Sequence, residues 1–336
     1  MRKLFLLITT LGLIMATGCN KPSESTNTAG SGGGKKLTIA FMPKSKGNQY
    51  FITCKNGAVK AAADLGIDLL FDGPTNTDPA KQNEIVENWI TLGVDVIAVA
   101  CENKEGISTA LRKAQAKGIK VITFDSDSMP DARSFFVNQA TATGIANVLM
   151  DTAAQLCGGE GEFAIITATL TANNMNEWRK NIDLRLKEKY PKMKLVETKP
   201  CDDQKDKAQQ ETANLLGAYP NLKCVMAICS PAVPGAAEAV KQAGKVGKVK
   251  VLGLGLPSEN RAYVKDGVTQ AVILWKVEDL GYLTIAAATA LAKGELKPGA
   301  TTFKAGKLGE IQLQGSDIVL GQPFVFTKEN IDQFDF

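Results

Sequence analysis

Two spacings of apolar residues alternate along this chain from residue 37 to about residue 292. Short unbroken apolar runs, typical of parallel strands buried on both faces, are followed by longer stretches whose apolar residues recur at helical spacing. The run Ile119–Phe124 is the clearest strand. The stretch 79–92 is the clearest helix, and its apolar stripe places Trp89 in the core. This order of elements predicts an α/β protein built from doubly wound parallel sheets.

The predicted elements fall into two series of similar size. The expected strands are 37–42, 67–71, 94–100, 119–124, 162–168, 194–198, 223–229, 248–254 and 271–274. The expected helices are 49–65, 79–92, 105–117, 141–156, 174–190, 205–218, 234–242, 258–265 and 280–292. Short strand-like runs follow over 301–336. The two series meet near residues 137–141, and we expect a ligand to bind between them because pockets are common at domain interfaces.

The N-terminal pattern is that of a secretory leader. Arg2 and Lys3 precede an apolar stretch over 4–15, which is too short to span a bilayer as a stable helix. Three small residues then stand directly before Cys19. This triplet resembles a lipobox, the signal for acylation of the cysteine, although alanine stands where leucine is usual. We therefore expect a signal peptide over residues 1–18.

The residues after the leader indicate a tether. They are rich in Ser, Thr, Gly and Asn, a composition typical of flexible linkers. The expected arrangement is a lipid anchor on Cys19, a flexible tether over 19–36 and a globular part held on the outer side of a membrane. The predicted location is the periplasm or cell envelope.

Composition removes several classes of function. The net charge is +4, and it falls to +2 once the two basic residues of the leader are removed. A net charge this small does not indicate nucleic-acid binding. The chain has no histidine, which excludes His-based triads and ordinary zinc sites that contain His. No Walker-type sequence occurs, and Gly253 and Gly255 lack the third glycine of a dinucleotide loop. We therefore expect no enzyme activity, no cofactor and no metal.

Six cysteines remain besides Cys19, an even number that permits disulfides in an exported protein. Cys101, Cys224 and Cys229 lie in or at the ends of apolar runs, where cysteine is often a small buried hydrophobe. The sequence has no C-x-x-C pair. The pairing of the cysteines stays open.

Polar or aromatic residues follow several strands, where the ligands of open α/β sheets bind. Asp125 ends the strand 119–124, and it either meets a ligand or caps the next turn. Lys44 follows the first strand, and it either donates to a ligand hydroxyl or is solvated. Trp275 ends a later strand, and it either stacks on the C–H face of a sugar or lies in the core.

Side-chain amides mark two further positions. Asn138 and Gln139 lie at the junction of the two halves, where they suit sugar hydroxyls or form a hinge turn. Asn174, with Glu177 three residues later, has the pattern of a helix N-cap. That interpretation leaves Asn173 or Asn176 free to face a cleft.

Several segments taken together resemble the periplasmic sugar-binding proteins of ABC importers, which have the type I fold. The resemblance covers nearly all of the mature chain and is strongest to the rhamnose-binding and autoinducer-2-binding subgroup. The matching segments are Lys44-Ser45, Gly47-Asn48, Phe51, Gly73 to Thr75, Gly93 to Asp95, Asp125 to Asp127, Asn176, Trp178, Gly253 to Glu259, Asp279 to Tyr282 and Asn330 to Phe334.

The resemblance implies two α/β domains that are joined by three crossings of the chain and close on a ligand. The N-terminal domain would comprise 37–137 plus 276–303, and the C-terminal domain 138–275 plus 304–336.

The resemblance also implies ligand contacts. In the autoinducer-2 branch these are a Lys, an Asp, an Asp-Gln pair, a Pro and an Ala. Here Lys44 and Asp125 match, Asn174 and Met175 replace the Asp-Gln pair, and Pro234 and Ala236 match in type. The replacement favours a deoxyhexose over autoinducer-2. The complete set of expected ligand-binding residues is Lys44, Phe51, Asp125, Asn138, Asn174, Met175, Asn176, Pro234, Ala236 and Trp275.

The resulting expectation is a monomeric binding protein that captures a rhamnose-like monosaccharide and delivers it to an ABC permease. The alternative is a subunit that senses a sugar or autoinducer-2 and presents it to a receptor kinase.

Overall fold

The computed structural model of the protein describes residues 36–336. The predicted signal peptide over 1–18, the acylation site Cys19 and all but the last residue of the predicted tether lie outside the described residues. Within the described part, no helix combines the length and the apolar character needed to cross a membrane.

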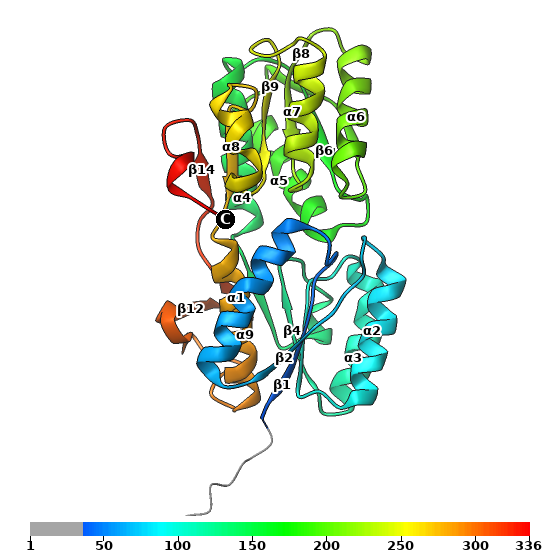
Figure 1. The fold of residues 1–336 in the computed structure, drawn as a ribbon, viewed down its shortest axis with the longest axis vertical. Helices are drawn as coiled ribbons and strands as arrows, with labels where there is room; N and C mark the ends of the chain where they lie inside the picture. The colour runs from blue at the N-terminus through cyan, green and yellow to red at the C-terminus, as the bar shows by residue number, and fades with distance from the viewer. Residues whose placement is uncertain (1–35) are drawn as a thin grey trace, which may run out of the picture. The chain divides into compact units, whose positions relative to one another are not determined.

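Two mostly parallel sheets organise the described chain (Figure 1). The first sheet has the strand order β11-β12-β13-β5-β4-β3-β1-β2, and the second has the order β14-β10-β9-β8-β6-β7. The first contains β1 (Thr38–Met42), β2 (Asp68–Phe71), β3 (Val96–Val99), β4 (Lys120–Phe124), β5 (Phe135–Asn138), β11 (Thr302–Lys304), β12 (Glu310–Gln314) and β13 (Asp317–Val319). The second contains β6 (Gly161–Thr167), β7 (Met193–Pro200), β8 (Leu222–Ala227), β9 (Lys250–Leu254), β10 (Ala271–Leu274) and β14 (Phe324–Phe326).

Antiparallel pairing is confined to the later strands of the described chain: β12 pairs this way with β11 and β13, and β14 with β10. The strands from β1 to β10 pair in parallel, with helices between them. The helices are α1 (Gln49–Leu65), α2 (Pro79–Leu92), α3 (Lys104–Ala116), α4 (Ala142–Cys157), α5 (Asn173–Lys189), α6 (Lys205–Ala218), α7 (Ala232–Gln242), α8 (Pro257–Lys265) and α9 (Val277–Ala292). The predicted fold class, two doubly wound α/β domains, is confirmed.

The first sheet is buried on both faces, as its apolar strands predict. Ile39 and Phe41 of β1 belong to one hydrophobic cluster, with residues of α1 and α9, whereas Ala40 and Met42 belong to another, with residues of α2 and α3. This division follows from the alternation of side chains along a strand. Trp89 of α2 lies in the second cluster, so the prediction that it is a core residue is confirmed.

The chain passes between the two sheets three times. The first two passages lie between β5 and α4 and between β10 and α9, close to the predicted domain boundaries at 137 and 275. The third predicted boundary, at 303, falls inside β11. Because β12 and β13 pair within the first sheet, we place the third passage at 320–323. The division into domains at these points stays a prediction.

Side-chain N-caps start the helices α1 to α4, but not α5 to α9, of the described chain. Gly158, with φ 71°, closes α4 in the left-handed conformation that glycine favours, as predicted. The predicted N-cap role of Asn174 is wrong: α5 begins at Asn173, and its N-cap Ala172 has no side-chain hydrogen bond to the helix. From the first turn of the helix, Asn174 Oδ1 instead accepts from Lys44 Nζ at 2.9 Å and from the Met175 N–H at 3.0 Å.

Candidate ligand-binding site

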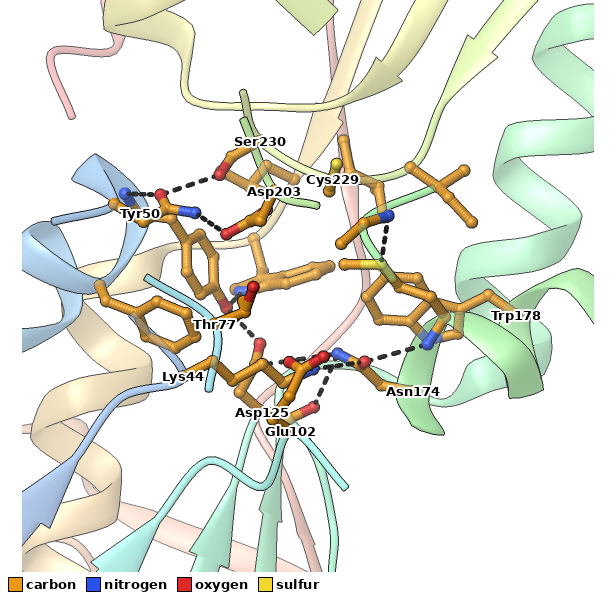
Figure 2. Close-up of a pocket in the computed structure, with 18 residues that line it drawn as sticks. Lys44, Tyr50, Thr77, Glu102, Asp125, Asn174, Trp178, Asp203, Cys229 and Ser230 are labelled. Carbon is orange, nitrogen blue, oxygen red and sulfur yellow. Dashed lines mark hydrogen bonds and ion pairs between the residues drawn. The ribbon is translucent and has the colours of Figure 1, made fainter. Parts of the chain in front are cut away.

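A cavity lies between the carboxyl ends of the strands of the two sheets (Figure 2). Its empty volume is about 480 Å³, a figure that includes open solvent at its mouth. The residues that line it are Lys44, Asn48, Tyr50, Phe51, Thr77, Glu102, Asp125, Ala168, Asn174, Met175, Trp178, Asp203, Ile228, Cys229, Ser230, Leu254, Leu274 and Trp275. Both sheets therefore contribute to one site.

Lys44 joins the two sheets at one side of the cavity, where Figure 2 shows it beside Glu102, Asp125 and Asn174. It follows β1, yet only 4% of the residue is exposed. Its Nζ donates a hydrogen bond of 2.9 Å to Asn174 Oδ1 on α5 and lies 3.8 Å from Glu102 Oε2. A buried ammonium needs such partners because it has lost its hydration. The solvated alternative for Lys44 is therefore wrong.

Asp125 lies at the end of β4, in a left-handed backbone conformation with φ 61°. The Tyr50 hydroxyl donates to its Oδ1 at 2.8 Å, and Asn174 Nδ2 lies 3.4 Å from its Oδ2. Gln139, at the junction of the two halves, donates to the Asp125 carbonyl oxygen at 3.1 Å. Burial raises the pKa of Asp125 to about 6, although nearby Lys44 opposes the rise. The left-handed backbone and the perturbed carboxyl together make Asp125 a candidate functional position.

Asp203 and Ser230 form the opposite side of the cavity. Both contact Asn48, the N-cap residue of α1: its Nδ2 donates to Asp203 Oδ2 at 2.6 Å, and its Oδ1 accepts from the Ser230 hydroxyl at 3.0 Å. Asp203 also has a positive φ, of 57°, and burial raises its pKa. The first sheet is thus connected to the second at this side as well.

Carboxylates outnumber ammonium groups in the cavity lining. Glu102, Asp125 and Asp203 face a single ammonium, that of Lys44. Glu102 Oε1 accepts from the Thr169 hydroxyl, but the buried Oε2 has no hydrogen-bond partner in the described residues. A carboxylate is an acceptor only, so the cavity has an excess of acceptors. It is suited to a ligand that presents several hydroxyl or other donors.

An apolar wall adjoins this polar cluster. Trp275 is buried, its Nε1 donates to the Tyr50 hydroxyl at 3.0 Å, and its ring centroid lies 6.4 Å from that of Trp178. Phe51 and Met175 extend the wall. A ligand that is polar on its edges and apolar on one face, as a sugar is, matches this combination.

Six of the ten predicted binding residues line the cavity: Lys44, Phe51, Asp125, Asn174, Met175 and Trp275. The other four are not among its lining residues. Asn176 donates to Leu170 O in the preceding turn and accepts from Arg179 within α5. Asn138 pairs with β13, and Pro234 and Ala236 are buried within α7. Ligand contacts by the six lining residues stay a prediction. The positions of the other four do not support a role for them in ligand binding.

Six residues of the lining with a hydroxyl, amide or carboxylate group are absent from the predicted binding set: Asn48, Tyr50, Thr77, Glu102, Asp203 and Ser230. Glu102 and Asp203 follow β3 and β7, so the strand-end rule that selected Asp125 also applies to them. For Asn48 the sequence indicates only membership in a segment, Gly47-Asn48, that resembles the family. Ser230 follows β8, so the same strand-end rule applies to it. The position of Tyr50 depends on how α1 packs, for which the sequence has no local signal.

The chain is similar to a known family and to known proteins over most of its length. A family model described as a periplasmic binding protein domain matches residues 39–296. The ribose import binding protein RbsB of Bacillus subtilis is 27% identical over 305 residues, covering 88% of this chain and 95% of the relative. The D-allose-binding periplasmic protein of Escherichia coli is 28% identical over 254 residues, covering 72% of this chain and 80% of the relative.

Solved structures show the same architecture. An ABC transporter solute-binding protein from Clostridium phytofermentas with bound L-rhamnose is 31% identical, with a TM-score of 0.86, and the match covers 89% of this chain and 98% of that one. LsrB from Clostridium saccharobutylicum in complex with AI-2 has a TM-score of 0.84 over 89% of this chain and all of that one. At 23% identity, the second likeness concerns the fold alone.

Proposed function

The chain belongs to the periplasmic binding protein family, and we propose that it captures a monosaccharide between its two sheets and delivers it to an ABC permease. The ribose- and allose-binding relatives and the rhamnose-bound neighbour support a sugar as the ligand. The permease partner, the location outside the cytoplasmic membrane, the lipid anchor on Cys19 and a monomeric state belong to the same proposal. Such a protein binds and releases its sugar and carries out no reaction on it.

One observation carries the proposal: the buried cluster of Lys44, Asn174 and Asp125, which spans the two sheets at the cavity. A sugar that leaves water must have its buried hydroxyls paired, since an unpaired polar group costs about 1–3 kcal/mol. Lys44 supplies a charged donor and Asp125 a charged acceptor, which make the stronger hydrogen bonds. Because the cluster exists only when the two sheets approach, it couples binding to closure.

Within the sugars, we propose a rhamnose-like deoxyhexose. The apolar wall of Phe51, Met175, Trp178 and Trp275 can cover a methyl group that replaces a hydroxyl. The rhamnose-bound neighbour is the relative that supports this choice. The acceptor-rich opposite side would receive the remaining hydroxyl donors.

The test is a thermal-shift panel on residues 36–336, which form one compact unit. The panel contains L-rhamnose, other deoxyhexoses, D-ribose, D-allose, D-arabinose and autoinducer-2 in borate-free buffer. A ligand that binds the native state raises the Tm as its concentration rises, and we expect this for one sugar, with the shift lost in Asp125→Ala. A folded, ligand-free sample that responds to no sugar in the panel would refute the monosaccharide proposal.

A further inference from the structure

Two cysteine thiols lie close together at the side of the cavity formed by the second sheet. Cys201 Sγ and Cys229 Sγ are 3.5 Å apart, although 28 positions separate them in the sequence. Cys201 is fully buried, and Cys229, which lines the cavity, is 3% exposed. The contact thus joins two segments that are remote along the chain.

Neighbouring strands do not explain this contact. Cys201 follows β7 and Cys229 follows β8, and β6 lies between these strands in the sheet. Strands two places apart are separated by about 9–10 Å, so the two segments must bend toward each other over the end of β6. The Cys201 N–H donates to the carbonyl oxygens of Thr167 and Ala168 at the end of β6. The Ile228 N–H, just before Cys229, donates to Ile166 O of β6.

The turn after Cys201 is strained. Asp202 and Asp203 have φ values of 52° and 57°, in the left-handed region that side chains other than glycine disfavour. Two such residues in succession need surrounding structure to hold them. A covalent tie at Cys201 would fix the chain directly before this turn.

We propose that Cys201 and Cys229 form a disulfide in the exported protein. Each thiol loses its hydrogen, one S–S bond forms, and two electrons and two protons pass to a disulfide oxidant, which becomes two thiols. The two sulfurs must approach from 3.5 Å to about 2.05 Å. Small rotations of the two side chains together supply this movement. An oxidising compartment outside the cytoplasm lets such a bond persist. The proposal therefore rests on export, and not on the identity of the ligand.

The disulfide would join two parts of the binding site. Asp203 lies two residues after Cys201, Ser230 directly follows Cys229, and both side chains contact Asn48 across the cavity. The tie would hold these two contacts in register before a ligand arrives. Burial raises the pKa of the Cys229 thiol well above its usual value, and the thiolate is the reacting form. The bond therefore forms as the chain folds, before Cys229 is enclosed.

The test starts from the full protein recovered from the cell envelope, with free thiols alkylated at lysis. Peptide mapping without reduction should recover a peptide pair linked through Cys201 and Cys229. Reduction should lower the Tm by about 5 °C, as expected for a bridge that closes a loop of this length in a protein of this size. Cys201→Ser and Cys229→Ser should each abolish the linked pair and this Tm decrease.

The matched control is Cys54→Ser, which removes an equally buried thiol in the first sheet's core. This variant should keep the linked peptides and the response to reductant. Should a Cys201 or Cys229 variant not fold, mapping of the unaltered protein refolded with oxidised glutathione decides the question. Recovery of Cys201 and Cys229 as separate alkylated peptides from both the envelope and the refolded sample would overturn the proposal. So would a linkage found only between Cys157 and Cys224, whose side chains also contact each other.

Discussion

Asp125 is the residue at which burial and binding compete. Its carboxylate is enclosed, and its pKa rises from an ordinary value near 3.8 to about 6 because burial penalises the charged form. The folded protein therefore holds this proton more tightly than the unfolded chain does. By linkage, Asp125 costs stability on the order of 3 kcal/mol above pH 6, and the cost disappears as the pH falls toward 4. Above this pH the ligand-free site holds an ionised Asp125, which is ready to accept a hydrogen bond from a ligand donor.

The first prediction concerns Asp125→Asn. This variant removes the titrating group, so its free energy of unfolding relative to the wild type should depend on pH. The free energy of unfolding of the variant minus that of the wild type should fall by about 2 kcal/mol from pH 7.5 to pH 4.5. Urea denaturation at several pH values measures it. The exposed Glu310→Gln serves as the control and should show no comparable trend. A difference for Asp125→Asn that is independent of pH would contradict the raised pKa.

Residues at strand ends could be predicted from the sequence, whereas residues placed by helix packing could not. Lys44 and Asp125 follow apolar strands, and the carboxyl ends of parallel strands share one edge. A resemblance predicts ligand contacts for Pro234 and Ala236, but both residues are buried within α7. Asn174 had a local pattern for capping, but its contact with Lys44 arises from the approach of two sheets. Local patterns contain no information about that approach.

Among the elements, the close packing of α1 against α9 depends on two glycines. Figure 1 shows these helices side by side over the first sheet. A Cβ at Gly57 would lie 1.7 Å from Glu278 O, and a Cβ at Gly281 would lie 1.8 Å from Cys54 O. Backbone atoms cannot move aside as flexible side chains do. The two helices must therefore separate if either glycine acquires a side chain.

The second prediction follows from this packing. Gly281→Ala should destabilise the protein by at least about 2 kcal/mol, because an inserted methyl group forces a shift of the backbone. Gly217→Ala is the matched control: it lies in α6 with open space around its Cβ, and it should be stabilising by about 0.5–1 kcal/mol. Thermal or urea unfolding measures both changes. Equal effects of the two substitutions would refute the role assigned to the α1–α9 contact.

The sequence predicted the strands and helices up to α9 well, except for β5. The long periodic segments are correct within a few residues, and α2 has the predicted bounds. The strand β5 (Phe135–Asn138) was not predicted, because no α-helix separates it from β4 and it therefore falls outside the alternation of strands and helices. The pairing of β12 and β13 with the first sheet was also missed. These edge strands pair with residues remote in the sequence, so no local pattern specifies their partner.

At the scale of the whole described chain, side-chain hydrogen bonds connect the two sheets around the cavity. Lys44 contacts Asn174 at one side, and Asn48 contacts Asp203 and Ser230 at the other. These contacts exist only when the sheets are close together. Removing one should therefore weaken closure, and with it ligand binding, more than it weakens either half.

The third prediction uses Ser230→Ala, which removes the hydroxyl that donates to Asn48 Oδ1. A hydrogen bond of this kind contributes about 0.5–1.5 kcal/mol, so the affinity for the bound sugar should fall about 2- to 10-fold. The Tm of the ligand-free protein should change little. Ser316→Ala is the control, since its hydroxyl contacts Arg133 and lies away from the cavity, and it should leave the affinity unchanged. An unchanged Kd in Ser230→Ala would show that this contact takes no part in closure.

Isothermal titration of L-rhamnose, or of the sugar that the thermal-shift panel selects, tests the central claim most directly. The account predicts one site per chain in residues 36–336, with binding lost in Lys44→Met, which removes the buried ammonium that joins the sheets. Lys46→Met should bind as the wild type does, because this neighbouring lysine is exposed and contacts only Asp72 through its side chain. A folded Lys44→Met protein that binds the sugar with wild-type affinity would contradict the account.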